Sequence, residues 1–249
     1  AGLIGRVLRV SSYYDDAADN CPYHTVSRMR FLVDADVTEV QAHAQLSEGI
    51  RPIDTGRELI TEETWTQAQL QFENGVLGSC TYVTYWTRPL RTGHPRFTSV
   101  EGTEGFVVSG LWSPNMLRRV EDGRAMDYPL QVETHAVDGA DVPTRFFFET
   151  DPPVEFQNPF ANRALPLGSG WEGLARAHEL ESLYRAVTEG AEPAYSVERA
   201  RRDQELAILL TESAEQREPL RAQSAGGADT RWEATKNEEF RRRYGVDLL

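Results

Sequence analysis

Two segments of the chain alternate between apolar and polar residues. Within residues 38–46 and 65–72 the even-numbered positions are mostly apolar and the odd-numbered positions mostly polar. A period of two is typical of strands that bury one face and leave the other polar. Asn74-Gly75 follows the second segment and favours a tight hairpin turn. The pattern therefore predicts neighbouring strands, continued by a further strand over residues 77–86.

Shorter strand-like segments lie on either side of this pair. Residues 3–14 form an apolar run, and residues 97–101 and 106–109 flank a turn that contains two glycines. Asp122-Gly123 is a second hairpin signal. Strands are therefore expected to dominate the middle of the chain.

A first helix is expected from Pro22, with Asn20 or Cys21 as its N-cap. His24 would lie near its start, on the same side as Phe31. Apolar side chains three or four positions apart predict one buried stripe, formed by Tyr23, Val26, Met29 and Val33.

Two more helices are expected toward the end of the chain. Ser169-Gly-Trp-Glu172 is a capping-box pattern that predicts a helix ending at Glu189-Gly190, and Ser196 suits the N-cap of another helix that reaches about Gln216. The proline-rich residues 151–170 are expected to form a loop over the sheet. The buried side of the second helix is expected to comprise Leu174, Leu180, Leu183, Tyr184 and Val187.

This order of elements favours an α+β fold, with one open, mostly antiparallel β-sheet and helices packed on one face. We expect a single domain over residues 1–222. Residues 223–230 are small and polar, which is typical of a flexible link. Residues 223–249 are therefore expected to form a linker and a C-terminal helical tail.

Composition narrows the possible functions. The net charge is −13 and the isoelectric point is about 4.9, which argues against binding to nucleic acid or to an anionic membrane. No stretch approaches the roughly 18 apolar residues of a membrane span. Cys21 and Cys80 form no CxxC pair, so neither a metal site nor a disulfide is expected, and a cytoplasmic location fits. Lys236 is the only lysine, so no lysine before the tail could act in catalysis.

Four local patterns occur in a fixed order along the chain. They are Asn20-Cys-Pro-Tyr-His24, Phe72-Glu-Asn-Gly-Val-Leu-Gly-Ser79, Glu101-Gly-Thr-Glu-Gly105 and Pro193-Ala-Tyr-Ser-Val-Glu-Arg-Ala200. In this order, roughly residues 1–220 resemble the C-terminal domain of the glucose–fructose oxidoreductase / inositol dehydrogenase (Gfo/Idh/MocA) family. Gly2 and Gly5 do not make a dinucleotide-binding fingerprint, and the family's Glu-Lys-Pro motif is absent. The resemblance therefore implies that the nucleotide-binding (Rossmann) half of such an enzyme is not part of this sequence, which begins without Met.

The resemblance implies that His24 is catalytic. In the family, a histidine near the start of this helix lies beside the nicotinamide and the carbon that is oxidised, and it commonly follows an Asp or Asn by four residues, here Asn20. Histidine suits the role, because oxidation of an alcohol releases a proton that a near-neutral base can accept. The family often has Asp where this chain has Ser27, which is a departure from its pattern. A structural or exposed histidine is the alternative.

Substrate contacts are expected from strand ends and loops that carry aromatic, polar and arginine side chains, which suit a ring-shaped hydroxylated ligand. Each of these residues could equally belong to ordinary loop or sheet packing. The candidates are Asn20, Tyr13, Tyr14, Trp86, Arg88 and His94, with Arg96 beside them.

The resemblance implies the substrate-binding and oligomerisation domain of an NAD(P)-dependent oxidoreductase that acts on a hydroxyl of a sugar, glycoside or polyol. NAD or NADP would bind the complete enzyme, no cofactor is expected for this chain alone, and the chain alone would be inactive. The alternative is a non-redox sugar-binding or scaffold subunit that partners a separate catalytic chain. The family also pairs subunits through the uncovered sheet face, so a homo-oligomer is expected through Gln41, His43, Gln67, Gln69 and Gln71.

Overall fold

The structure is a computed structural model of the whole chain. It divides into two compact units: unit 1 comprises residues 1–7 and 97–200, and unit 2 comprises residues 8–96 and 201–249. Each unit is considered by itself. The residues that the structure describes are 2–13, 22–54, 59–83, 96–110, 115–163, 165, 170–222, 238 and 241–245.

Unit 2 is built on a sheet in the order β12-β2-β3-β4-β1. The β12–β2, β2–β3 and β3–β4 pairs are antiparallel, whereas β1 and β4 are parallel. Its elements are β1 (Val7–Tyr13), α1 (Pro22–Val33), β2 (Val37–Asp54), β3 (Leu59–Phe72), β4 (Leu77–Val83), α4 (Val197–Gln216) and β12 (Leu220–Arg221).

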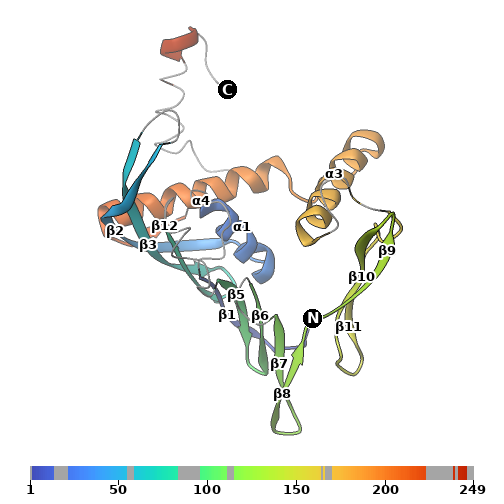
Figure 1. Cartoon of the computed structure of the whole chain (residues 1–249). Coiled ribbons are helices and arrows are strands. Elements are labelled where there is room, and N and C mark those ends of the chain that lie inside the picture. Colours follow the sequence, from blue (N-terminus) through green and yellow to red (C-terminus); the bar gives the residue numbers. More distant parts are fainter. Residues whose placement is uncertain are drawn as a thin grey trace. The chain divides into compact units, whose positions relative to one another are not determined.

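Alternation along β3 gives this sheet two different faces. Ala68, Leu70 and Phe72 are buried, whereas the glutamines between them are exposed. The buried residues lie on the face that α1 and α4 cover, and the two helices run over the same side of the strands in Figure 1. The expected open, mostly antiparallel sheet with helices on one face is confirmed.

A glycine lets α1 approach the sheet closely. A Cβ atom at Gly78 of β4 would lie 2.8 Å from Met29 Cε and 3.0 Å from the Phe72 ring. Because carbon atoms do not pack at these distances, a larger residue at this position would push the helix away. Val26 and Met29 are fully buried in the contact.

Helix α4 is held at both ends by serine hydroxyls. Ser196 accepts a hydrogen bond from the Arg199 N–H at 3.3 Å, which confirms the expected N-cap. The fully buried Ser213 donates to the Glu218 carbonyl at 2.6 Å and accepts from the Ala42 N–H at 3.0 Å. The bond from the Ala42 N–H ties the end of α4 to β2.

Buried charges join α1 to α4. Arg30 of α1 pairs with Asp203 of α4, and its Nε lies 3.0 Å from Asp36. Arg202 donates from Nε to Asp36 at 2.9 Å and from a terminal nitrogen to the Val37 carbonyl at 3.2 Å. Asp203 is only 1% exposed. Such groups are tolerated in a core only when each charge is compensated, as they are in this network.

Unit 1 contains antiparallel hairpins and one helix. Its strands follow the orders β5-β6-β7-β8 and β11-β10-β9. The elements are β5 (Phe97–Gly102), β6 (Gly105–Ser109), β7 (Met116–Glu121), β8 (Arg124–Pro129), β9 (Gln131–Val137), β10 (Ala140–Phe148), β11 (Val154–Gln157) and α3 (Trp171–Glu189).

Two-residue turns connect two of these strand pairs. Asp122 and Gly123 both have positive φ, at 49° and 74°, and Asp138 and Gly139 repeat the arrangement at 50° and 79°. Consecutive positive φ values match the twist of a hairpin, and Asp and Gly tolerate them best. The hairpin expected at Asp122-Gly123 is confirmed.

Several expectations for unit 1 are wrong. Residues 151–170 are not simply a loop, because Val154–Gln157 forms β11 and pairs with β10. The N-cap of helix α3 is Gly170, without a side-chain capping bond, whereas Ser169 of the expected capping box lies outside the described residues. Of the side chains expected to be buried on this helix, Leu174 is buried, but the four that follow it are exposed. Periodicity identifies an apolar face but not whether another element covers it.

The sequence predicts a domain boundary near residue 222, and this residue is the last of the described range 170–222. The structure describes β12 up to Arg221, and residues 223–237 lie outside the described residues. The start of the chain differs from the expected strand over residues 3–14, because β1 begins at Val7. Residues 4 and 6 instead accept backbone hydrogen bonds from Glu104 and Thr103.

Removing the charge of Asp203 should destabilise unit 2. We expect Asp203→Asn to lower the free energy of unfolding by roughly 1.5–3 kcal/mol, because Arg30 loses its charged hydrogen-bond partner but keeps its pair with Asp36. Urea unfolding followed by circular dichroism measures this loss. Asp127→Asn is the matched control, since Asp127 pairs with Arg118 on an exposed hairpin and should change little. Equal midpoints for the two variants would contradict a stabilising role for the buried network.

Candidate functional site

His24 lies in the first turn of α1, on the side that faces away from the sheet. At about 100° per residue, its direction is roughly 160° from that of Val26 and opposite to that of Val33. Both valines are buried, whereas His24 is exposed. The same packing that buries Val26 and Val33 therefore turns the imidazole of His24 outward.

Two aromatic side chains accompany His24 on α1. The ring centroids of Tyr23 and His24 are 4.2 Å apart, with the planes tilted by 41°. Phe31, two turns further along, is 79% exposed on the same outward side. The outward face of α1 therefore carries the imidazole of His24 beside apolar side chains. Such a face can contact a reacting group through the imidazole and an apolar ring through the neighbouring side chains.

Tyr13 is the last residue of β1, and the pleat places it on the other face of the sheet. Its neighbour Ser12 is buried and pairs in register with Cys80, on the side that α1 covers. Tyr13 pairs with Thr81, which is in register with the exposed Gln67. The structure therefore does not place Tyr13 on the face that α1 covers.

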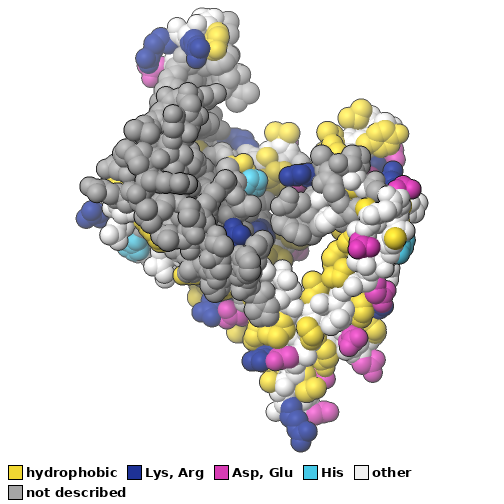
Figure 2. Space-filling view, in the orientation of Figure 1, with side chains coloured by type: hydrophobic (Ala, Val, Ile, Leu, Met, Phe, Trp, Pro, Cys, Tyr) yellow, Lys and Arg dark blue, Asp and Glu magenta, His cyan; other side chains and the backbone are white. Residues whose placement is uncertain are grey.

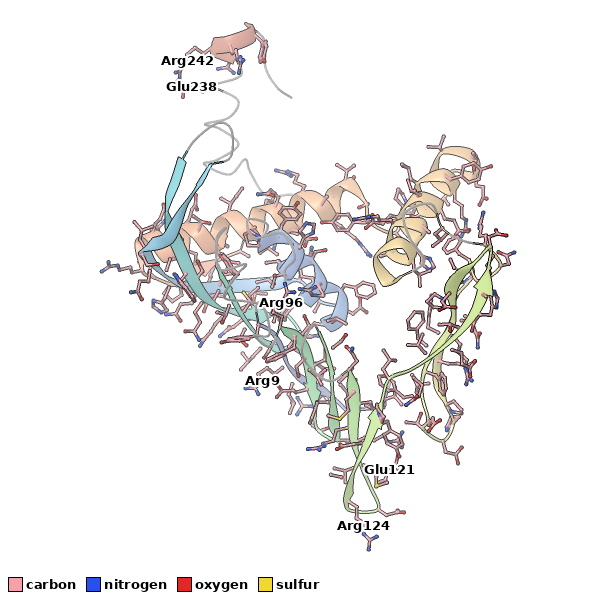
Figure 3. The ribbon with its side chains drawn as sticks, viewed as in Figure 1. Arg9, Arg96, Glu121, Arg124, Glu238 and Arg242 are labelled. Carbon is pink, nitrogen blue, oxygen red and sulfur yellow. The ribbon has the colours of Figure 1, made fainter. Side chains whose placement is uncertain are left out.

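The other predicted substrate residues cannot be placed in the structure. Those that lie outside the described residues are Asn20, Tyr14, Trp86, Arg88 and His94. Arg96 is described immediately before β5 and is labelled in Figure 3. Its Nε is buried and has no hydrogen-bond partner among the described residues. The sequence placed Arg96 beside the substrate candidates, but it could not predict this burial, because periodicity carries no information about one guanidinium nitrogen.

Cys80 and Tyr82 lie on β4, on the covered side of the sheet. Burial raises the pKa of the Cys80 thiol to about 12. Burial and the neighbouring Cys80 raise the pKa of Tyr82, against a hydrogen bond with Thr66 that lowers it. Both groups are therefore protonated at neutral pH, and Cys80 is not a nucleophile. The described residues include no group of three or more His, Cys, Asp or Glu side chains that could hold a metal ion.

The uncovered face of the unit 2 sheet is a mostly polar surface, which we call the open face. Gln41 pairs with Gln69, and Gln69 with Ser79, in one row across the strands. Ser79 donates to Ser11 Oγ at 3.0 Å and extends the row to β1. The open face comprises Glu39, Gln41, His43, Gln67, Gln69, Gln71, Ser79, Thr81, Ser11 and Tyr13, together with the exposed apolar residues Trp65 and Leu77.

A family model described as "Oxidoreductase family, C-terminal alpha/beta domain" matches residues 19–221. The chain therefore belongs to this family, the C-terminal domain of the Gfo/Idh/MocA oxidoreductases, as its motifs indicate. A search of curated proteins finds no match.

Solved structures of oxidoreductases share the fold. Levoglucosan dehydrogenase in complex with NADH and L-sorbose is 19% identical, with a TM-score of 0.53, over 89% of this chain and 60% of that one. An oxidoreductase domain protein from Kribbella flavida is 16% identical, with a TM-score of 0.56, over 90% and 60%. Aldose-aldose oxidoreductase from Caulobacter crescentus, complexed with glycerol, is 12% identical, with a TM-score of 0.50, over 89% and 57%. The chain thus spans about three fifths of these structures' length.

Among the helices that the structure describes, none is both long and apolar enough to span a membrane.

The protonated state of Cys80 should make the fold sensitive to alkaline pH. The native thiol keeps its proton up to about 12, whereas an unfolded thiol loses it near 8.5 to 9, so the native state binds more protons in between. The free energy of unfolding should therefore fall by up to about 1.4 kcal/mol per pH unit in this range. Urea unfolding at pH 8, 9 and 10 measures the slope, to which Tyr82 contributes in the same direction above about pH 10.

Cys80→Ala is the informative variant. It should have a shallower slope than the wild-type chain, because one of the two buried acids is gone. Peptide mass spectrometry should also show that iodoacetamide at pH 8 modifies Cys80 in urea but not in the native chain. Equal slopes, or rapid native alkylation, would show that the thiol is not held protonated by burial.

Proposed function

We propose that this chain is the substrate-binding domain of an NAD(P)-dependent oxidoreductase that acts on a hydroxyl of a sugar, glycoside or polyol. Membership of the oxidoreductase family supports the general class. Similar folds occur in levoglucosan dehydrogenase with NADH and L-sorbose and in aldose-aldose oxidoreductase with glycerol. The observation that carries the proposal is the exposed His24 at the start of α1, in the position where the family has its histidine.

His24 would accept the proton of the substrate hydroxyl at one imidazole nitrogen while the carbon gives up a hydride. A bound nicotinamide would accept that hydride. The outward direction of His24 leaves its ring accessible to a substrate held between α1 and a nucleotide-binding domain. Since Lys236 is the only lysine, any catalytic lysine would come from that domain.

The substrate would be held by polar and aromatic groups around His24. We propose Asn20, Tyr14, Trp86, Arg88 and His94 for this role, as the sequence predicts. Arg96 supports the 86–96 segment, because its Nε has no hydrogen-bond partner among the described residues and a guanidinium nitrogen can donate to a substrate hydroxyl. Tyr13 is the weaker candidate, since it lies on the open face.

The nicotinamide cofactor would bind only when a nucleotide-binding domain or subunit is present. Gly168 to Gly173 matches the pattern GxGxxG, but it does not directly follow a strand, and the preceding strands β9, β10 and β11 are antiparallel. It therefore lacks the βαβ setting in which such a loop binds a pyrophosphate. Calorimetric titration of this chain with NADH or NADPH should therefore give no micromolar affinity. A cytoplasmic location is part of the proposal, and the free thiol of Cys80 supports it.

A sugar-binding or scaffold subunit without redox activity is the second candidate. The intact mass of the native gene product distinguishes the two. A product with about 130–150 additional residues, the size of a nucleotide-binding domain, supports the dehydrogenase.

In the complete enzyme, His24→Ala should lower turnover by roughly 10²–10⁴-fold, which is the usual contribution of general acid–base catalysis. Cofactor affinity should remain nearly unchanged, because His24 would act on the substrate proton. Steady-state kinetics and a melting curve measure both effects. His135→Ala is the matched control, since His135 is exposed on β9. Wild-type turnover in His24→Ala would remove His24 from the mechanism.

We also propose that two copies associate through the open face. Its glutamines can exchange hydrogen bonds with a second copy, as in polar subunit interfaces. Gln69→Glu places a charge near the centre of this surface and should weaken association, because the same charge would be present on both copies. Light scattering measures the change, with Thr134→Glu on the exposed β9 as the control. A wild-type chain that is monomeric at high micromolar concentration would contradict the proposal.

A further inference from the structure

Helix α3 exposes four large apolar side chains along one side. Leu180 is 62% exposed, Leu183 57%, Tyr184 65% and Val187 79%. They follow the spacing i, i+3, i+4 and i+7, which places them on one face of a helix. We call these four residues the α3 stripe. Figure 2 shows hydrophobic side chains gathered on the outer surface of this helix.

A different side of α3 packs within unit 1. The His178 ring lies 5.8 Å from the Phe156 ring and 5.0 Å from the Phe160 ring, and Leu174 is buried on the same side. At about 100° per residue, the mean direction of the α3 stripe is roughly 150° from the side that carries His178 and Leu174. The contacts that hold α3 in its unit therefore do not use the stripe.

Helix α3 is amphipathic, but its widest apolar face points to solvent and not to the core of its unit. Polar residues flank that face, including the Arg185–Glu189 ion pair at 3.2 Å. Contiguous exposed apolar patches with a polar rim mark contact surfaces. An apolar stripe at this spacing is also the pattern with which helices dock into a complementary groove.

We infer that the α3 stripe is the contact surface for the nucleotide-binding domain of the complete enzyme, an inference that rests on the proposed function. About two fifths of the length of the levoglucosan dehydrogenase chains lies outside the match, and these structures hold NADH. Permanent contacts are more apolar than transient ones. The α3 stripe therefore fits a partner that stays attached, such as another domain of the same chain.

Leu183→Asp places a charge at the centre of the α3 stripe and tests the inference. In this chain alone, the melting temperature and the sedimentation coefficient should not change, because the stripe is uncovered there. In the complete enzyme, the melting temperature should fall and the Kd for NADH should rise by about tenfold or more, since a desolvated contact at the domain interface is lost. Amide exchange over residues 180–187 should also be slower in the complete enzyme than in this chain.

Val120→Asp is the matched control, because Val120 is 54% exposed on β7 of the same unit. It should change neither form of the protein. A lower melting temperature for Leu183→Asp in this chain alone would show that the stripe packs within the chain and would overturn the inference. Loss of a dimer would assign the stripe to a second copy instead.

An unchanged complete enzyme would also overturn the inference. This result is distinguishable from failure of the proposed function. A gene product whose intact mass leaves no room for a nucleotide-binding domain, or normal turnover in His24→Ala, would count against the function. Neither result depends on Leu183.

Discussion

The packing of α1 onto the unit 2 sheet is the constraint on which the candidate site depends. Val26 and Met29 are fully buried, and Gly78 leaves the space that Met29 occupies. The pairing of Arg30 with Asp203 adds a compensated charge contact to α4. With the rotation of α1 fixed in this way, His24 can only face outward. Its exposure is thus a consequence of the core, not an independent feature of the helix start.

The molecule leaves two surfaces of opposite character uncovered. The open face of unit 2 presents rows of glutamine and serine side chains, such as Gln41, Gln69 and Ser79, which water can solvate well. The α3 stripe of unit 1 presents large apolar side chains that water solvates poorly. This contrast supports assigning different partners to them, a second copy to the first and a nucleotide-binding domain to the second.

An enzyme of this design divides its chemistry between domains. The substrate domain would contribute a base and the groups that hold the hydroxylated ring, and the other domain would contribute the hydride acceptor. Cys80 and Tyr82 remain protonated on the covered side of the sheet, so neither offers a competing thiolate or phenolate. His24 is then the residue on which a test of catalysis should concentrate.

The sequence by itself determined the class of fold, the family and most helix and strand positions, because alternation in β3 and the Asn74-Gly75 turn depend on neighbouring residues alone. The outward direction of His24 also followed from the helical period. Only the tertiary structure decided which apolar faces are covered. Leu174 and Leu183 lie on opposite sides of α3, and only the structure shows that the side with Leu174 is the covered one. The pleat likewise moved Tyr13 to the open face, since one residue of register reverses the side of a strand.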